Sequence, residues 1–326
     1  MTLILQSSAD GPAPGDPAAV ARAREADGRM RMRQRLAGIG LMALTMLMFA
    51  TLDMSAKLAA SHLPTLEVIW FRYAVHFALV VVLLNPVRAP GAWRMNNPRL
   101  QVLRALMLTA NTSLNFIALG YLQLTQTVSI MFLSPLLIAM LSALFLKEHV
   151  GPRRWAAIFT GFVGVLVVSR PGFGDFHWAM LVSLGSVTCY ALYVLLTRHL
   201  GQSETPGSLI LVSAAVPTLL LAPLLPAVWV WPSDPLTILL LVGLGVLGGG
   251  GHYLLILAHR KVAASVLAPV TYTQIVWMVS LGYFVFGDVP DLWTLIGAGI
   301  VIASGLYLLQ RERIRTPHDA GRSFGT

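Results

Sequence analysis

Five ionisable residues stand inside two strongly apolar stretches near the start of the chain. Asp53 and Lys57 are four residues apart in the first stretch, a spacing that places them on one face of a helix. Glu67, Arg72 and His76 follow in the second stretch, beyond a short turn. An ionisable group inside a membrane span costs several kcal/mol unless it is paired or hydrated, so each is a candidate functional residue. We expect all five to meet in one polar cluster.

This cluster has two interpretations, and the sequence leaves both open. In the first, two ion pairs form a structural network that fixes the packing of the two helices. In the second, the five residues serve gating and coupling: Asp53 or Glu67 changes protonation as a gate at that end of the helices moves, and Arg72 binds an anionic group of a ligand.

Amide and imidazole groups occupy two later apolar stretches. Asn111 and Asn115 stand near the middle of the first, and the second carries His252 in the run GGGGHY at matching depth. Small residues let helices approach closely, and amides at such depth bond across an interface. We expect the glycines to serve packing, and the three polar residues to contact a bound small molecule.

Aromatic residues form a further group of candidate ligand-binding side chains. Tyr190 and Tyr193 share one apolar stretch, and Tyr272, Gln274 and Trp277 share another. An aromatic surface with a few placed polar groups suits a flat heteroaromatic ligand. The alternative is that these side chains belong to the core or face lipid.

The composition identifies the class of protein that holds these residues. Of 326 residues, 56% are hydrophobic and 11% are charged, against roughly 25% charged in a soluble domain, so this is an integral membrane protein. The net charge of +9 does not indicate nucleic-acid binding, because the basic residues lie between apolar runs. No metal-ligand spacing or phosphate-binding loop is present, so we expect no enzyme activity, no cofactor and no metal.

A bilayer core of about 30 Å takes roughly 20 helical residues. On that scale we predict an all-α integral membrane protein with ten transmembrane helices: Leu36–Ala59, Leu66–Leu84, Leu103–Gly120, Thr127–Leu146, Trp155–Val168, Trp178–Leu196, Ser208–Leu225, Leu236–Leu257, Ala263–Phe286 and Leu292–Leu309.

Positive charges beside these spans set the predicted orientation. All but four of the 23 Lys and Arg residues fall in the terminal segments and alternate connections. Lys and Arg are retained on the cytoplasmic side, so both termini are predicted there. Arg104, at the cytoplasmic end of the third span, can snorkel to the interface. We expect residues 1–35 to form a disordered basic tail and residues 310–326 a second cytoplasmic tail.

A long internal repeat organises the spans. The stretch Phe116–Val168 has the same layout as Ile256–Leu309, and an offset of 140 places Glu148 on Asp288. The predicted units are residues 36–170 and 176–309, with five spans each. Because five is odd, the second unit enters the membrane from the opposite side, and inverted halves of this kind enclose a site near the midplane that opens to each side in turn. We expect Pro135 and Pro269 to kink the helices where the gates bend.

The motifs that end and follow the fourth and ninth spans, FLKE with GFVGV and VFGD with GAGIVIASG, resemble the EamA family of the drug/metabolite transporter superfamily. Within it, LDMSAK, WFRY and TYTQIVWMVSLGYFVFGDVPDLWTLIGA are similar to bacterial members that import riboflavin or S-adenosylmethionine. Related members export amino acids or metallophores. One departure is Ser134-Pro135 in the first copy against Gln274-Ile275 in the second.

The resemblance and the repeat together indicate a secondary active transporter in the bacterial inner membrane. It would move a small polar or heteroaromatic metabolite, riboflavin-like or S-adenosylmethionine-like, with protons as a candidate coupling ion and as a monomer or homodimer. The alternatives are an exporter working by proton antiport, a non-transporting scaffold or channel, and an intramembrane enzyme.

Overall fold

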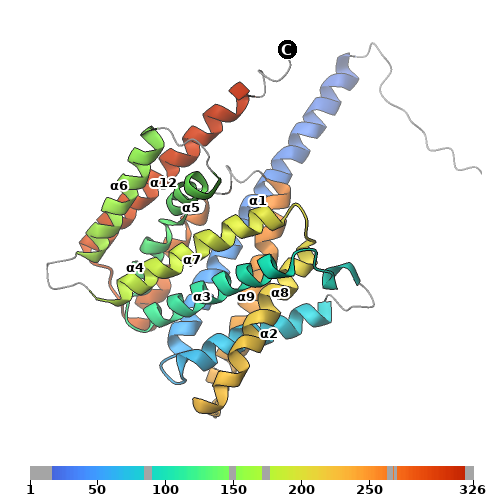
Figure 1. Cartoon of the computed structure of the whole chain (residues 1–326). Coiled ribbons are helices and arrows are strands. Elements are labelled where there is room, and N and C mark those ends of the chain that lie inside the picture. Colours follow the sequence, from blue (N-terminus) through green and yellow to red (C-terminus); the bar gives the residue numbers. More distant parts are fainter. Residues whose placement is uncertain are drawn as a thin grey trace, which may run out of the picture.

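The computed structural model describes residues 17–83, 90–146, 152–170, 177–262, 267 and 270–319. Regular structure in this part of the chain is helical (Figure 1). The α-helices are α1 (Pro17–Ala59), α2 (Thr65–Leu83), α3 (Pro98–Leu119), α4 (Leu124–Met131), α5 (Ser134–Leu146), α6 (Pro152–Ser169), α7 (Ala179–Leu200), α8 (Pro206–Leu221), α9 (Pro235–Lys261), α11 (Gln274–Leu281) and α12 (Leu292–Asp319). Three shorter segments are η1 (Pro90–Trp93), η2 (Ala222–Ala227) and the π-helical turn η3 (Gly282–Phe286).

Within the described chain, seven helices are long and apolar enough to cross a membrane. They are Gly28–Ala59, Thr65–Leu83, Pro98–Leu119, Leu124–Ser142, Ala179–Leu200, Pro206–Ala227 and Pro235–Ala258. Three shorter apolar helices, Trp155–Ser169, Gln274–Phe286 and Leu292–Tyr307, lie at the predicted fifth, ninth and tenth spans. The prediction of an all-helical, multi-pass membrane protein is confirmed.

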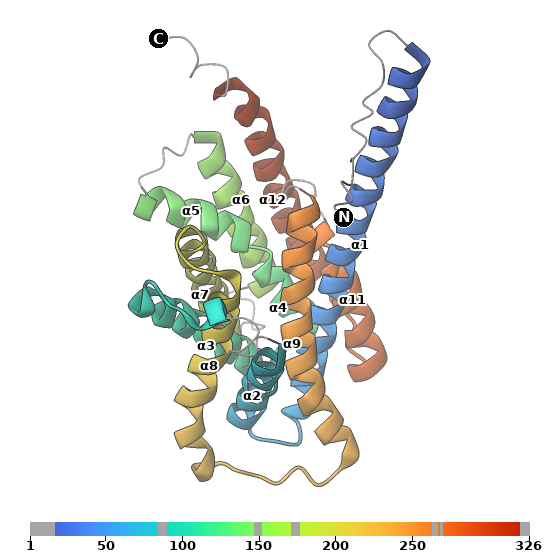
Figure 2. The same cartoon turned by 90° about the vertical axis from the view of Figure 1, so that its right-hand side faces the viewer.

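The N-terminal segment differs from the prediction of a disordered tail over residues 1–35. Helix α1 begins at Pro17 and continues without a break to Ala59. Its first half is rich in Ala, Arg and Met, which are good helix formers, and Pro favours a first helical turn. Residues 1–16 lie outside the described chain. Figure 2 shows that the start of α1 and the end of α12 extend beyond the bundle at the same end.

Two helix breaks occur at the same place in the two copies of the repeat. Leu133 N donates to Ile130 O between α4 and α5, and Thr273 N donates to Val270 O before α11, both at 3.0 Å and 140 positions apart. These tightened turns are typical of helix ends. A helix break lies beside Pro135, where a kink was predicted, and this residue stands in the first turn of α5; Pro269 lies outside the described residues.

The two breaks also meet in space. The rings of Phe132 and Tyr272, themselves 140 positions apart, pack edge to face with centroids 4.9 Å apart. The main helix pairs follow the same relation: α1 packs along α9, α3 along α7, α6 along α12 and α2 along α8. Adding 140 to the residue numbers turns α1 into α7 and α3 into α9, so each pair maps onto another or onto itself.

Glycines allow α6 and α12 to approach until their backbones touch. A Cβ atom on Gly164 would lie 2.9 Å from the carbonyl oxygen of Gly297, and one on Gly297 would lie 2.6 Å from the carbonyl oxygen of Gly164. Because these neighbours are backbone atoms, no side chain can move aside. The pair is a small-residue helix contact of the kind common in membranes.

We predict that Gly297→Ala lowers the free energy of unfolding by about 1–3 kcal/mol, the usual cost of overpacking. The control is Gly299→Ala in the same helix, because nothing lies within 4 Å of its added Cβ. Thermal unfolding of the detergent-solubilised protein measures both. Equal midpoints for the two variants would contradict the close α6–α12 contact.

Candidate functional site

A central polar cluster forms where α1, α2 and α3 meet. Asn115 Nδ2 donates a hydrogen bond of 3.0 Å to Asp53 Oδ1. The positive charge of Arg72 acts on both Asp53 and His76. Arg72 and His76 are 6% and 5% exposed, so they face the protein interior and not the lipid. Three of the five predicted gating residues therefore gather here, together with Asn115.

Arg72 is buried with incomplete hydrogen bonding. Its guanidinium lies 4.6 Å from the centroid of the Tyr73 ring. Nε and Nη1 are buried and have no hydrogen-bond partner in the described chain. On the facing helix α9, a Cβ on Gly248 would lie 3.7 Å from Nε, so this wall carries no side chain. Since a buried unsatisfied polar group costs about 1–3 kcal/mol, and more when charged, the arrangement needs an explanation beyond packing.

The glycine run of α9 provides close helix packing, as predicted. A Cβ on Gly249 would lie 2.8 Å from His76 Cδ2, and one on Gly251 would lie 2.6 Å from Phe49 Cε1. His252 follows this run, with its ring centroid 5.2 Å from that of Phe49. The charges of Arg72 and His76 both act on His252, which places it beside the central cluster.

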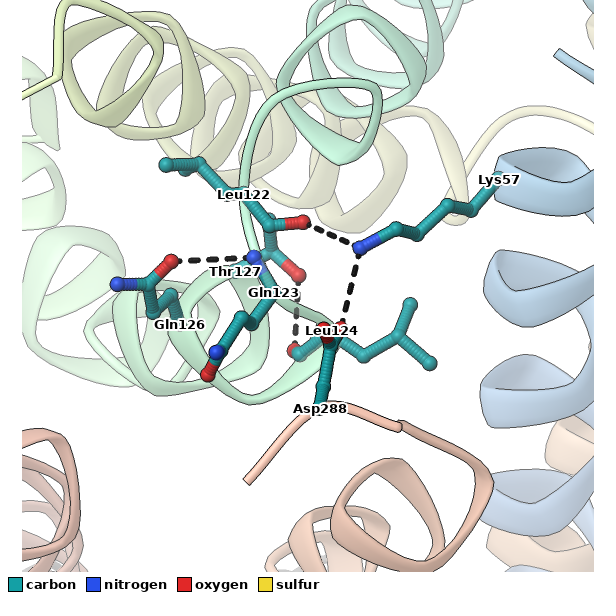
Figure 3. Close-up of polar contacts among 7 residues, drawn as sticks. All are labelled: Lys57, Leu122, Gln123, Leu124, Gln126, Thr127 and Asp288. Carbon is teal, nitrogen blue, oxygen red and sulfur yellow. Dashed lines mark hydrogen bonds and ion pairs between the residues drawn. The ribbon is translucent and has the colours of Figure 1, made fainter. Parts of the chain in front are cut away.

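Lys57 does not belong to the central cluster, contrary to the prediction. Its Nζ donates to Leu122 O at 2.9 Å and contacts Asp288 Oδ2 at 3.2 Å (Figure 3). The side chain also lies over the ring of Phe286, 4.8 Å from the centroid. The i, i+4 spacing does hold, but Lys57 is in the last turn of α1, and its long side chain reaches past the helix end.

The chain segments that carry the partners of Lys57, the Leu122 carbonyl and Asp288, are fixed by local structure. Gln126 Oε1 accepts a hydrogen bond of 3.0 Å from Gln123 N in the α3–α4 turn, as Figure 3 shows. Gly287 has a φ of 71°, in the left-handed region that favours glycine, and turns the chain just before Asp288. Lys57 thus ties the first repeat to the second.

Glu67 is the second departure from the predicted cluster. Its Oε2 accepts a hydrogen bond of 3.1 Å from Val230 N, in the segment before α9. It stands in the first turn of α2, so its side chain reaches the connection outside the bundle centre. The expectation that five ionisable residues form one cluster is wrong: they form three separate sets.

Asn111, Tyr190 and Tyr193 lie at the α3–α7 contact. Ser186 Oγ is 2.8 Å from the carbonyl oxygen and 2.9 Å from Oδ1 of Asn111, so Asn111 helps to join the two helices. The rings of Tyr190 and Tyr193 are 6.2 Å apart on α7. Tyr193 faces the guanidinium of Arg104, 5.3 Å from its ring centroid.

Tyr272, Gln274 and Trp277 line the seam between the repeats. Tyr272 packs on Phe132, and a Cβ on Gly305 would lie 2.0 Å from its hydroxyl oxygen. The Tyr272 hydroxyl and Trp277 Nε1 are buried without a hydrogen-bond partner in the described residues. Gln274 is half-buried at the start of α11. Among the contacts described, none joins these three residues to Asp53 or Arg72.

Arg104 does not snorkel, which corrects the sequence prediction. It is 1% exposed and turns inward. Nη2 donates to Leu209 O at 2.5 Å and to Ser213 Oγ at 2.8 Å, and Nη1 donates to Thr197 Oγ1 at 3.3 Å. The guanidinium therefore binds acceptors on α7 and α8 instead of reaching the membrane surface. The available signal was a hydroxyl residue in each of two apolar stretches, Thr197 and Ser213, but their partner in α3 was not evident.

Glu204 is a buried carboxylate that the sequence analysis did not identify. Its Oε1 accepts hydrogen bonds from Asn96 N at 2.9 Å and Asn97 N at 2.6 Å, just before α3. Burial acts to raise the pKa of Glu204, but these hydrogen bonds and that of Gln101 more than offset it, so the pKa lies below its ordinary value. The carboxylate caps the positive end of α3. In the searched part of the chain, no group of three His, Cys, Asp or Glu residues is placed to hold a metal ion.

An all-helical, multi-pass membrane protein with ionisable side chains buried between its helices has the general form of a membrane transporter. The chain belongs to the EamA-like transporter family, whose pattern it matches twice, over residues 36–170 and 177–310. The family resemblance of the sequence motifs is thereby confirmed, and no enzyme family is indicated.

Several characterised relatives are similar along most of their length. The chain is 29% identical to a riboflavin transporter of Vibrio cholerae, covering 82% of this chain and 90% of the relative. It is 28% identical to an S-adenosylmethionine uptake transporter of Rickettsia bellii, covering 85% and 94%. A pseudopaline exporter of Pseudomonas aeruginosa is 24% identical, covering 85% and 97%. A known crystal structure shares the fold with a TM-score of 0.58, at 16% identity over 87% of this chain and 99% of the other.

We predict that Arg104→Gln destabilises the protein by about 2–4 kcal/mol, since hydrogen bonds from a charged group contribute about 1.5–3 kcal/mol each and the shorter side chain retains few of them. Arg99→Gln is the matched control, because Arg99 is exposed in the first turn of the same helix. Thermal unfolding in detergent compares the two. Equal, small shifts of the unfolding midpoint in both variants would contradict the buried position of Arg104 and indicate that it snorkels.

Proposed function

We propose that the chain is a secondary active transporter that moves a small metabolite by alternating access. Ten spans, arranged as two inverted halves of five, would cradle the central cluster near the midplane, with both termini on the cytoplasmic side of the inner membrane. The observation that carries the proposal is the exchange of helix pairs under an offset of 140, with the two helix breaks in contact at Phe132 and Tyr272. Paired broken helices around a central site are a recurrent design of transporters.

The substrate in this proposal is a riboflavin-like or S-adenosylmethionine-like metabolite, and the names of the relatives support both classes. Asp53, Arg72, His76, Asn115 and His252 would contact it, with Asn111, Tyr190 and Tyr193 behind them. Protons are the proposed coupling ion, because Asp53 and His76 are titratable and lie beside the site. Export by proton antiport is the second candidate, and the pseudopaline exporter supports it.

Two ion pairs between the halves would form a gate on one side. Lys57 pairs with Asp288 at 3.2 Å, and Arg170 Nη2 pairs with Asp291 Oδ2 at 2.5 Å. Each joins the end of a helix in the first repeat to the connection between η3 and α12 in the second. We name the Lys57–Asp288 pair, with the Leu122 carbonyl, the latch. In the proposed orientation, with both termini in the cytoplasm, the latch would lie on the outer side.

Counterflow in liposomes tests transport. Protein reconstituted into liposomes loaded with unlabelled riboflavin or S-adenosylmethionine should accumulate the labelled compound transiently and saturably, because alternating access exchanges substrate across a closed barrier. Empty liposomes are the control. Non-saturable flux would indicate a channel, and no flux for any compound that the protein binds would contradict the proposal.

We predict that Asp288→Asn opens the latch side more often. Removing a partly exposed ion pair should shift the open population about 2–5-fold, since such pairs contribute up to about 1 kcal/mol. The reporter is Asn115→Cys in a Cys189→Ser background, because position 115 lies about 10 Å deeper than Leu122 at 1.5 Å per residue. The rate of labelling by an impermeant thiol reagent from outside should rise accordingly.

Asp234→Asn is the matched control for the latch experiment. Asp234 lies on the same side but caps its own helix, with its Oδ1 accepting from Thr237 N at 2.8 Å. It should leave the labelling rate unchanged. Equal labelling rates in Asp288→Asn and the parent would show that this ion pair does not control access.

A further inference from the structure

Arg72 combines nine-tenths burial with hydrogen-bond donors that have no partner in the described chain. Glu67 is also buried with an unpaired Oε1, but it lies apart from the central cluster and binds Val230 N. Arg72 is 6% exposed, and its Nε and Nη1 have no hydrogen-bond partner in the described chain. Arg104 is equally buried, but three acceptors on α7 and α8 bind its two terminal nitrogen atoms, and Nε is left without a partner in the described chain. A planar guanidinium with free N–H groups is suited to a carboxylate, which accepts two parallel hydrogen bonds.

Among the carboxylates whose side chains are described, Asp53 is the one that acts on Arg72. Every other carboxylate whose side chain is described is engaged elsewhere: Glu67 with Val230, Glu204 with Asn96 and Asn97, Asp234 with Thr237, Asp288 with Lys57 and Asp291 with Arg170. Asp53 lies within electrostatic reach of Arg72, and Asn115 is its hydrogen-bond partner, at Oδ1.

We propose that Arg72 and Asp53 form a subsite for a zwitterionic, amino-acid-like end of the substrate, which rests on the transport function proposed above. The substrate carboxylate binds the free N–H groups of Arg72, and a cationic group of the substrate binds Asp53. Gly248, on the facing helix α9, has no side chain to cover Arg72. A Cβ atom added to Gly248 would lie 3.7 Å from Arg72 Nε.

Charge balance favours this class of ligand. Arg72 and Asp53 together carry no net charge, and a zwitterion adds none, so the loaded site stays neutral while it crosses the low-dielectric interior. A lone anion or cation would leave a net buried charge, which is strongly disfavoured there. Of the compounds named for the relatives, S-adenosylmethionine has a zwitterionic amino-acid end, with one carboxylate and one ammonium group, and its sulfonium is a further positive charge outside that end; riboflavin has neither a carboxylate nor an ammonium group.

Ligand pairs that differ by the carboxylate test the subsite. Purified protein is titrated with S-adenosylmethionine and decarboxylated S-adenosylmethionine, with L-methionine and 3-methylthiopropylamine, and with riboflavin. Binding is followed by calorimetry and by thermal stabilisation. At least one compound with the carboxylate should bind about tenfold or more tightly than its partner, as expected for charge-assisted hydrogen bonds. Equal binding within both pairs, or binding of riboflavin alone, overturns the proposal.

Variants test whether Arg72 causes the difference in affinity within each ligand pair. In Arg72→Gln the difference within the pair should collapse, because the charged N–H donors that bind the carboxylate are lost, and Arg72→Lys should retain part of it. Arg153→Gln, which alters an exposed Arg at the start of α6, should keep the full difference. Retention of the full difference in Arg72→Gln overturns the assignment.

A stability measurement separates a ligand site from a structural ion pair without any ligand. Arg72→Met combined with Asp53→Asn removes both buried charges and leaves neither unbalanced, so this double variant should unfold at a midpoint equal to or above that of the parent, in contrast to Arg104→Gln. A midpoint lowered as far as that of Arg104→Gln shows that Arg72 and Asp53 hold the fold, and the subsite fails. Counterflow of riboflavin without zwitterion binding would overturn the subsite alone, whereas absence of counterflow for every bound compound overturns the transport function.

Discussion

Because the hydrocarbon core offers no water, a polar side chain buried there must find its partners in the protein, in a ligand or at the membrane edge. Arg72 and Arg104 are both almost fully buried. Arg104 has three acceptors on neighbouring helices and keeps one nitrogen atom, Nε, without a partner among the described residues, whereas Arg72 keeps two, Nε and Nη1. The two buried arginines therefore differ in how far the described protein satisfies their hydrogen-bonding groups.

The carboxylates follow the same rule and join the two repeats. Glu67, at the start of α2, binds the amide of Val230 before α9, and Glu204, just before α8, binds the amides of Asn96 and Asn97 before α3. An offset of 140 turns α2 into α8 and α9 into α3, so both carboxylates connect equivalent places although their own positions are not equivalent. Both repeats have a carboxylate that binds backbone amides in this place, but the carboxylates come from non-equivalent sequence positions. This explains why comparison of the two copies could not find this contact.

Sequence patterns predicted the features that depend on single segments. Hydropathy located the helices, because each must match the bilayer thickness, and the proline in the first turn of α5 marked a helix break. Patterns were less informative where a long side chain chooses among distant partners. Lys57 and Arg104 are long enough to reach a second or third helix, so their partners depend on tertiary packing that spacing along one helix does not encode. The hydrogen bond between Asp53 and Asn115 likewise requires knowing that α1 lies against α3.

Equivalent positions near the ends of α1 and α7 meet a cation in different ways. The offset that relates the halves places Thr197 at the position of Lys57, and a threonine cannot form an ion pair. Thr197 instead accepts from Arg104, whose guanidinium is 1% exposed. The side chains of Lys57 and Asp288 are 18% and 22% exposed, so water can replace each partner at little cost when the contact opens. Releasing Arg104 would leave a buried charge unpaired, which costs far more. Opening is therefore easier at the latch than at Arg104, and the two sides of the bundle are not energetically equivalent despite their common layout.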